Sequence, residues 1–266
     1  MAIISTLGAA TDWVIEQVHE DTTGSKYLNR DHVMKSLSDG QTDLLDDKWW
    51  PFLEKDINFD SIIDQELTSN DATSITFADS SGFKDSGAVL VGKNIVTYIG
   101  NDDTDLTGCS INATFNANTI VKQLYEIETD LGITDFEKPI KLSTGVTKYD
   151  LVDPRNLYES DEFSVYDRSG TKYLMLPNQA EINPFTFQYS IEVVEIEDEE
   201  ATFVIPSKDI NILLQYALYN VKLQLELINA NVANLNHIRL KRKFKQKYSK
   251  QTHDTDNYIQ SIYNQR

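Results

Sequence analysis

The sequence has few of the residues from which catalytic and metal sites are built. Cys109 is the only cysteine among 266 residues, so the chain cannot form a disulfide within itself. The four histidines are scattered along the chain and contain no pair at the spacing of a zinc site. A glycine-rich phosphate loop and a nucleophile elbow are both missing. We therefore predict no catalytic residues, no bound metal, no cofactor and no enzymatic activity.

Long hydrophobic runs are also missing. No stretch approaches the roughly 20 consecutive apolar residues that a membrane-spanning helix needs. The first residues, MAIISTLGAATDWVIEQ, have no basic flank and reach an aspartate at position 12, which is unlike a secretory signal. The sequence therefore predicts a protein that has no membrane partner and is made or assembled in a cytosol.

Positive charge is scarce except in one segment. The chain has 42 Asp and Glu residues against 24 Lys and Arg residues, a formal net charge of −18. This balance argues against a protein that holds nucleic acid over most of its surface. It suits a solvated surface, adaptation to high salt, or a wall that passing DNA does not adhere to. Residues 239–250 carry seven cations, more than the one or two that complement a helix dipole. They predict contact with an oppositely charged partner, either protein or nucleic acid.

Residues 1–55 have the pattern of two helices. Asn29 is a good N-cap for the second helix, and apolar residues follow it at helical spacing. Pro51 forces the residue before it out of the helical region, so this helix must end near the two tryptophans that precede the proline. Aromatic side chains at such a point usually fill the joint between a helical layer and a β layer. We interpret them as a structural hinge formed by Trp49, Trp50, Pro51 and Phe52.

Residues 56–206 have the composition of an antiparallel β domain. A hairpin is predicted in residues 94–111, and a second one in residues 162–177 with its turn at Asp167 to Gly170. The alternation of FTFQYSIEV, residues 185–193, predicts a half-buried strand. Residues 118–133 favour a helix, although a strand also fits them.

The chain ends in helical sequence. An apolar face runs from Ile210 to Ile228, and residues 207–236 are predicted to form one long helix that begins just after Pro206. Residues 237–266 are basic and then polar. Leu240, Phe244 and Tyr248 would form only a narrow apolar stripe in a helix, so we predict that this segment becomes ordered on a partner.

Two acidic groups could carry chemistry. Asp102, Asp103 and Asp105 have a spacing that suits calcium, but the further oxygen ligands of a complete loop do not follow, and a hairpin turn explains them as well. The acidic run at residues 195–200 could pair two carboxylates, yet a solvated turn explains it more simply.

The order of these parts resembles that of the head-to-tail adaptor proteins of tailed bacteriophages. KYLNRDHVMKSLSDGQTDLLDDKWWPFLEKDINF is similar to the opening of this family, with Trp50, Pro51, Phe52 and Leu53 in the place of its W-P-F-L motif. VIPSKD and the helical sequence after it resemble the family's end, and Pro177 and Tyr189 match its strand–proline–strand passage. Residues 83–109 are similar to a short β unit of virion proteins, and they look like a hairpin insertion relative to the smallest adaptors.

The resemblance implies a structural role in the neck of a virion that is assembled in the host cytoplasm. Adaptors form a ring, typically of twelve subunits, beneath the portal protein. Such a ring carries the tail or a tail-completion protein and lines a channel through which double-stranded DNA passes without specific binding. The implied contact with the portal or a neighbouring subunit involves Arg239, Leu240, Lys241, Arg242, Lys243, Phe244, Lys245, Lys247, Tyr248, Tyr258, Ile259, Ile262 and Tyr263.

The expected fold class is α+β. Two N-terminal helices and a long C-terminal helix would form a helical bundle, into which an antiparallel β domain is inserted. Two other functions stay open at this point. A tail-fibre or baseplate module would share the β content, and a carbohydrate-acting hydrolase would need two carboxylates across a cleft.

Overall fold

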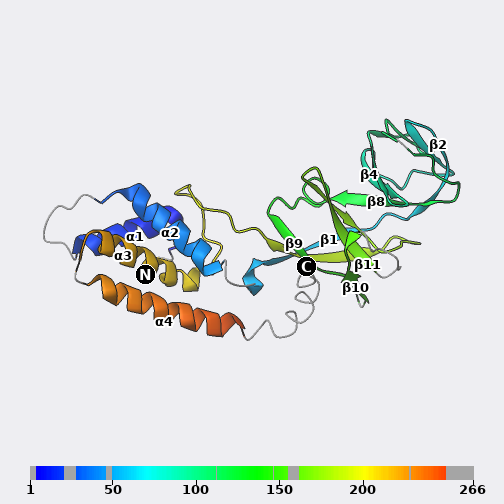
Figure 1. The fold of residues 1–266 in the computed structure, drawn as a ribbon. Coiled ribbons are helices and arrows are strands. Elements are labelled where there is room, and N and C mark those ends of the chain that lie inside the picture. Colours follow the sequence, from blue (N-terminus) through cyan, green and yellow to red (C-terminus); the bar gives the residue numbers. More distant parts are fainter. Residues whose placement is uncertain are drawn as a thin grey trace. The chain divides into compact units, whose positions relative to one another are not determined.

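The computed structural model describes residues 4–20, 28–45, 50–111, 113–145, 147–154, 162–227 and 229–249. The chain divides into two compact units. Unit 1 combines both ends of the chain, Met1–Glu54 and Glu192–Arg266, and unit 2 is Lys55–Ile191. Figure 1 shows unit 1 as helices and unit 2 as strands.

Unit 1 is built around one central helix. The third helix packs against each of the other three helices, because it is apolar on several faces and has seven buried residues. Two short 3-10 turns, η1 (Pro51–Leu53) and η3 (Ser207–Asp209), follow the second helix and precede the third. The helices are α1 (Leu7–Glu20), α2 (Arg30–Leu45), α3 (Asn211–Gln224) and α4 (Ala230–Ser249).

The N-terminal helices form largely where the sequence predicts them. Asn29 Oδ1 accepts a hydrogen bond from the backbone N–H of Asp31 at 3.0 Å, which confirms Asn29 as the cap of α2. The predicted apolar stripe of α2 is buried. The first helix begins at Leu7, and the hydroxyl Oγ1 of Thr11 donates to the carbonyl of Leu7 at 2.8 Å within it.

A tight contact joins three of these helices. Gly40 of α2 faces the ring of Tyr216 on α3, and a Cβ atom at this position would lie 2.7 Å from Tyr216 Cδ1. The same ring also packs on His237 of α4, with ring centroids 5.2 Å apart. The ring therefore has little room to move away from α2.

Gly40→Ala should destabilise unit 1 by about 1 to 2 kcal/mol, although alanine favours a helix over glycine by about 1 kcal/mol. The cause is the clash with Tyr216. Urea unfolding followed by circular dichroism measures the change. Gly82→Ala is the control, because a Cβ there meets nothing within 4 Å. If Gly40→Ala is as stable as the wild type, the contact is looser than described.

Unit 2 is formed by a large sheet. Thirteen strands are found among the described residues, in the order β1-β13-β9-β10-β11-β12-β8-β2-β3-β7-β6, with β4 on β8 and β5 on β4. Their bounds are β1 (Glu54–Asp60), β2 (Gln65–Asn70), β3 (Ser74–Phe77), β4 (Gly87–Val91), β5 (Asn94–Tyr98), β6 (Gly100–Asn101), β7 (Asp105–Thr107), β8 (Ile120–Glu126), β9 (Phe136–Thr144), β10 (Thr147–Leu151), β11 (Glu162–Arg168), β12 (Thr171–Met175) and β13 (Pro184–Ile191).

The predicted fold class is wrong. Of the described residues, 34% are in strands and 31% are helical, and the strands form a large mixed sheet, so the chain is not a helical bundle with a small inserted domain. The sheet is mixed because β10 and β11 pair in parallel, which alternation along a strand cannot reveal. Residues 118–133 also form a strand and a turn where a helix was favoured. Their partners on both sides, β4 and β12, override the helical spacing of the apolar residues.

Several local predictions in unit 2 are confirmed. Strands β11 and β12 form the expected hairpin, in which Asp167 Oδ1 accepts from the N–H of Gly170 at 3.2 Å. Residues 94–111 contain the hairpin of β6 and β7, while β5 pairs instead with β4. Strand β13 buries Phe185, Phe187, Tyr189 and Ile191 on one side, as the alternation predicts.

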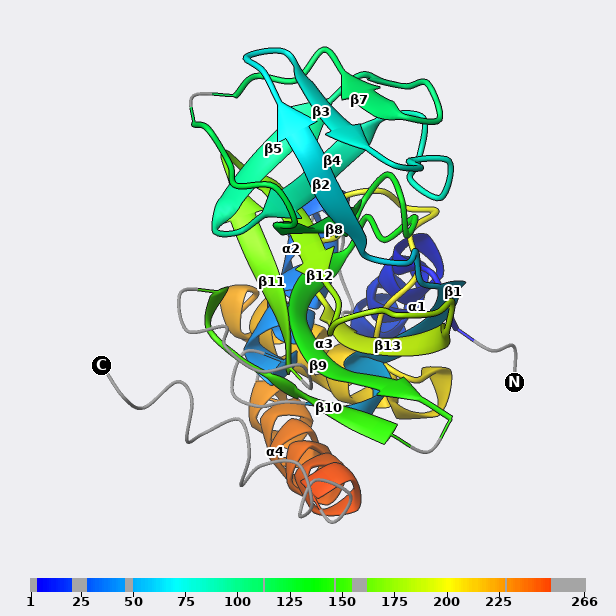
Figure 2. The ribbon, with the colours of Figure 1, turned by 90° about the vertical axis from the view of Figure 1, so that its right-hand side faces the viewer.

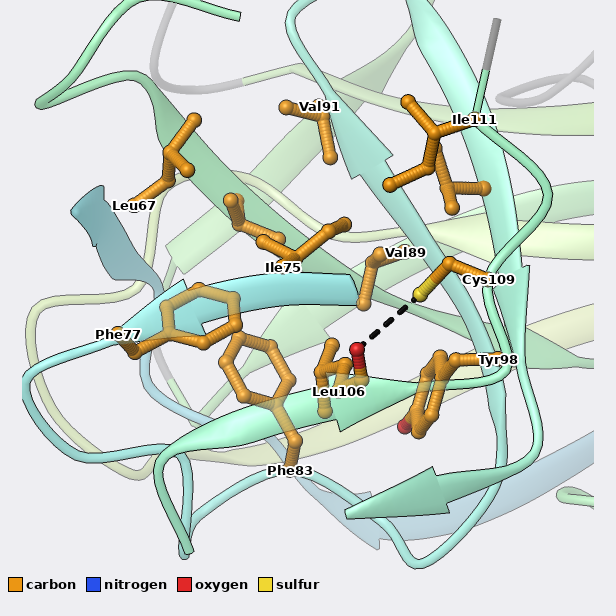
Figure 3. Packing of buried hydrophobic residues seen from close by; sticks show 12 residues of the cluster. Leu67, Ile75, Phe77, Phe83, Val89, Val91, Tyr98, Leu106, Cys109 and Ile111 are labelled. Atoms are coloured by element: carbon orange, nitrogen blue, oxygen red, sulfur yellow. Dashed lines mark hydrogen bonds between the residues drawn. The ribbon is translucent and has the colours of Figure 1, made fainter. Parts of the chain in front are cut away.

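One core of unit 2 lies among β2, β3, β4, β5, β7 and β8, most of which gather around it in Figure 2. Figure 3 shows its side chains, including Phe77 with its ring tilted against that of Phe83 and the thiol of Cys109 donating to the carbonyl of Leu106 at 3.2 Å. Burial raises the pKa of Cys109 to about 11, so it is a buried structural thiol.

Candidate docking surface on the C-terminal helix

The predicted long C-terminal helix is two helices. Helix α3 ends at Gln224, and Glu226 has a φ of 56°, a left-handed conformation that interrupts the helix before α4 begins. The expected boundary between residues 236 and 237 falls inside α4, so the bundle helix and the basic segment are not separate elements at that point.

Helix α4 has one buried side. Phe244 and Tyr248, two of the three residues of the predicted apolar stripe, are 2% and 8% exposed. His237 lies on the same side, and one of its ring nitrogens is 3.1 Å from the carbonyl oxygen of Ile212 on α3. Burial lowers the pKa of His237, which favours the neutral ring. The expectation that this stripe stays uncovered until a partner binds is therefore wrong for Phe244 and Tyr248.

An aromatic cluster holds the C-terminal half of α4. The ring of Trp50 lies 4.8 Å from that of Phe244 and 6.3 Å from that of Tyr248, and Phe52 lies 5.8 Å and 5.2 Å from the same two rings. Trp50 is 1% exposed. Pro51 places these rings by opening η1 directly after Trp50, whose backbone is extended.

The residues of the predicted hinge contact a different element from the one expected. The sequence placed Trp50 and Phe52 at a joint with the strands, whereas their described ring contacts are with α4 in unit 1. No sequence signal linked Trp50 to residues almost 200 positions later. Trp49 lies outside the described residues, and the fixing of one unit on the other stays a prediction.

Acidic residues of unit 1 hold the same side of α4. Asp209, the last residue of η3, just before α3, accepts hydrogen bonds from Lys247 Nζ at 2.7 Å and from the hydroxyl of Tyr248 at 2.8 Å. Lys241 Nζ lies 2.6 Å from Asp43 Oδ2 on α2. Two of the predicted partner-binding cations are therefore paired within the unit.

Asp209→Asn should lower the free energy of unfolding by about 1 to 2 kcal/mol, because it removes the charge that Lys247 and Tyr248 share. It should also speed tryptic cleavage at Lys247, since the end of α4 separates from α3 more often. Asp43→Asn is the matched control, with an expected loss below about 1 kcal/mol because Asp43 is half exposed. Equal effects of the two variants would contradict this ranking.

The opposite side of α4 faces solvent and has two parts. Its first half exposes three large apolar side chains, with Val232 59%, Leu235 68% and Ile238 47% exposed. The next turns expose Arg239, Arg242 and Lys243, none of which is in an ion pair with another described residue. The residues are three to four apart, so they share one side of the helix. We call this side, Val232, Leu235, Ile238, Arg239, Arg242 and Lys243, the outer face of α4.

The remaining predicted site residues divide into two groups. Leu240 and Lys245 of α4 are half-buried. Tyr258, Ile259, Ile262 and Tyr263 lie outside the described residues. Sequence reasoning found the basic part of the outer face from its charge, but it missed Val232 and Leu235, which lie in the predicted long helix beyond its apolar face.

The two acidic groups weighed as chemical sites are turns. Asp102 Oδ1 accepts from the N–H of Asp105 at 2.7 Å. Asp103 has a φ of 73°, a left-handed conformation that is common in turns. Residues 197–200 are exposed, and Asp198 Oδ1 accepts from the N–H of Glu200 at 3.0 Å. Within the described part of the chain, no group of three or more His, Cys, Asp or Glu residues could hold a metal ion.

Comparison with known proteins does not identify the chain. No known protein family matches it, and no curated protein matches it either. The helices of the described residues are all too short or too polar to cross a membrane. The outer face of α4 is therefore described by its chemistry alone, a surface suited to an acidic partner that also covers apolar side chains.

Proposed function

We propose that the protein is a structural component of a tailed-phage virion, a head-to-tail adaptor whose copies form a ring beneath the portal. The observation that carries this proposal is the composition of unit 1. Its N-terminal part includes Trp50 to Leu53 and its C-terminal part includes Pro206, the two regions on which the resemblance to adaptors depends. These regions lie far apart in the sequence, yet both contribute to one helical unit.

Each part has a task in this proposal. Unit 1 is the wedge that packs in the ring, and its α4 presents the docking surface. Unit 2 provides outward contacts to the tail or a tail-completion protein, and its sheet needs no catalytic group for that role. The net charge of −18 repels the double-stranded DNA that passes through the ring, so the DNA does not adhere to the channel wall where enough of the acidic residues face the lumen.

Electron microscopy of the purified protein, alone and mixed with the portal protein of the same phage, tests the proposal. We expect rings of one size that stack on the portal and retain little duplex DNA. A monomer that does not bind the portal contradicts the proposal. A trimeric rod would instead assign the chain to a fibre or baseplate.

A further inference from the structure

Unit 1 has a second mixed surface, opposite in charge to the outer face of α4. Glu192, Glu195, Glu197, Asp198 and Glu200 are exposed on the segment that leads from β13 toward α3. The same segment exposes Val194 to 63%. We call residues 192–200 the acidic segment. Of the large apolar side chains exposed on the described part of unit 1, all but Leu223 lie on the acidic segment or the outer face of α4.

The acidic segment is a fixed surface. Its backbone carbonyl at Glu199 accepts from the N–H of Gly8 at 2.9 Å, and the N–H of Ile196 donates to Ser38 Oγ at 2.9 Å. The side chain of Glu199 also pairs with Arg30 of α2. Because α1 and α2 both hold the segment, its exposed carboxylates are presented on a rigid support, which lowers the entropic cost of binding.

The charges indicate which partner covers the outer face. Helix α4 contains six Lys and Arg residues and no Asp or Glu, so it contributes a formal charge of +6. Because the whole chain has a formal charge of −18, the rest of the chain has a formal charge of −24. An acidic surface with an exposed apolar side chain is thus present on every copy of this protein. Nucleic acid offers the same charge, but a chain of −18 repels it overall.

We propose that the outer face of α4 on one copy binds the acidic segment of a second copy. Arg239, Arg242 and Lys243 then meet the carboxylates, and Val194 packs among Val232, Leu235 and Ile238. This apolar contact supplies affinity, while the charges set partner choice and the rate of encounter.

The two surfaces lie on different sides of unit 1. In Figures 1 and 2, α4 runs along the lower edge of the helices, whereas the yellow segment before α3 lies at their upper edge beside α2. A contact between unlike surfaces leaves one of each kind free on every dimer, so association continues until a ring closes or a filament forms. The inference rests on the proposed function only in expecting the closed ring.

Charge reversal tests the contact. The first variant is R239E/R242E/K243E, and the second is E195K/E197K/E200K, which leaves the Glu199–Arg30 pair intact. Sedimentation velocity at about 50 mM and about 500 mM salt measures self-association, because screening weakens this contact at high salt. We expect the wild type to associate at low salt, and each variant alone to lose at least about tenfold in affinity. An equimolar mixture of the two variants should associate again, because each reversed surface then meets an opposite charge.

A matched control changes the net charge equally at other exposed lysines. K35E/K148E/K208E makes the same change as the first variant, and it should associate like the wild type. Circular dichroism confirms that every variant is folded. A wild type that stays monomeric at both salt concentrations overturns the inference. Variants that associate normally alone, or a mixture that does not recover, overturn it as well.

Failure of this contact is distinguishable from failure of the proposed function. If the first variant still forms rings on the portal, the contact between copies lies elsewhere and the adaptor function stands. If copies associate through these surfaces but never bind a portal, the contact stands and the adaptor function fails.

Discussion

Trp50→Ala is expected to lower the free energy of unfolding of unit 1 by about 3 to 5 kcal/mol, the range for truncating a fully buried aromatic side chain. Trp50 is 1% exposed and touches Phe52, Phe244 and Tyr248. Its removal leaves a cavity between η1 and α4 and uncovers the two rings by which the C-terminal half of α4 is attached. Urea unfolding at 222 nm measures the loss, and rapid tryptic cleavage within α4 should accompany it.

Two further variants separate cavity formation from other causes. Trp13→Ala removes the same side chain from a half-buried position on α1, so a loss of only about 1 kcal/mol is expected. Trp50→Phe retains a ring against Phe244 and removes an indole N–H that has no hydrogen-bond partner among the described residues. It should cost about 1 to 2 kcal/mol. If Trp50→Ala unfolds within about 1 kcal/mol of the wild type, Trp50 does not hold α4 in place.

Local signals in the sequence predicted local structure well. Asn29 caps α2 as expected, because a side-chain cap needs only residues two or three positions away. The alternation in β13 and the turn at Asp167 to Gly170 were similarly readable. Each of these features depends on neighbours in the sequence, which a periodic pattern records directly.

Features that depend on distant partners were not predictable. Residues 120–126 have helical apolar spacing, but pairing with β4 and β12 makes them a strand. The parallel pair of β10 and β11 likewise has no signature in either strand. The break after Gln224 lies within a continuous apolar pattern, so one helix was expected where there are two.

The candidate site was predictable in its charge and not in its geometry. Arg239, Arg242 and Lys243 were identified because they contrast with an acidic chain. Which side of α4 they occupy depends on Trp50, which packs on the buried rings of Phe244 and Tyr248, and on Asp209, which binds Lys247 and Tyr248. The apolar part of the outer face became visible only once α4 was separated from α3.

Asp64→Asn should stabilise unit 2 above pH 6 by about 2 to 3 kcal/mol, since each pKa unit corresponds to about 1.4 kcal/mol. Asp64 lies just before β2, where its Oδ2 accepts from the N–H of Gln179 at 2.9 Å. Burial raises its pKa to about 6, against the opposing effects of that hydrogen bond and of Lys122. A carboxyl whose pKa is higher in the folded state binds more protons there than when unfolded. Stability therefore falls as the pH rises from about 4 through 6.

Asparagine cannot ionise, but it keeps an oxygen that accepts from the N–H of Gln179. The variant should therefore be as stable as the wild type near pH 4 and more stable than the wild type near pH 7.5. Denaturation midpoints at both pH values measure this difference, and a carboxyl titration by NMR measures the pKa of Asp64.

Asp71→Ala is the control, in which the expected effect on stability has the opposite sign. Hydrogen bonds from the N–H groups of Thr73 and Ser74 lower the pKa of Asp71, so its stabilising effect is present at neutral pH and its removal should destabilise there. A wild type whose stability does not fall between pH 4 and 6, together with an Asp64→Asn variant that is no more stable at pH 7.5, would show that the Asp64 carboxylate is solvated in the folded chain.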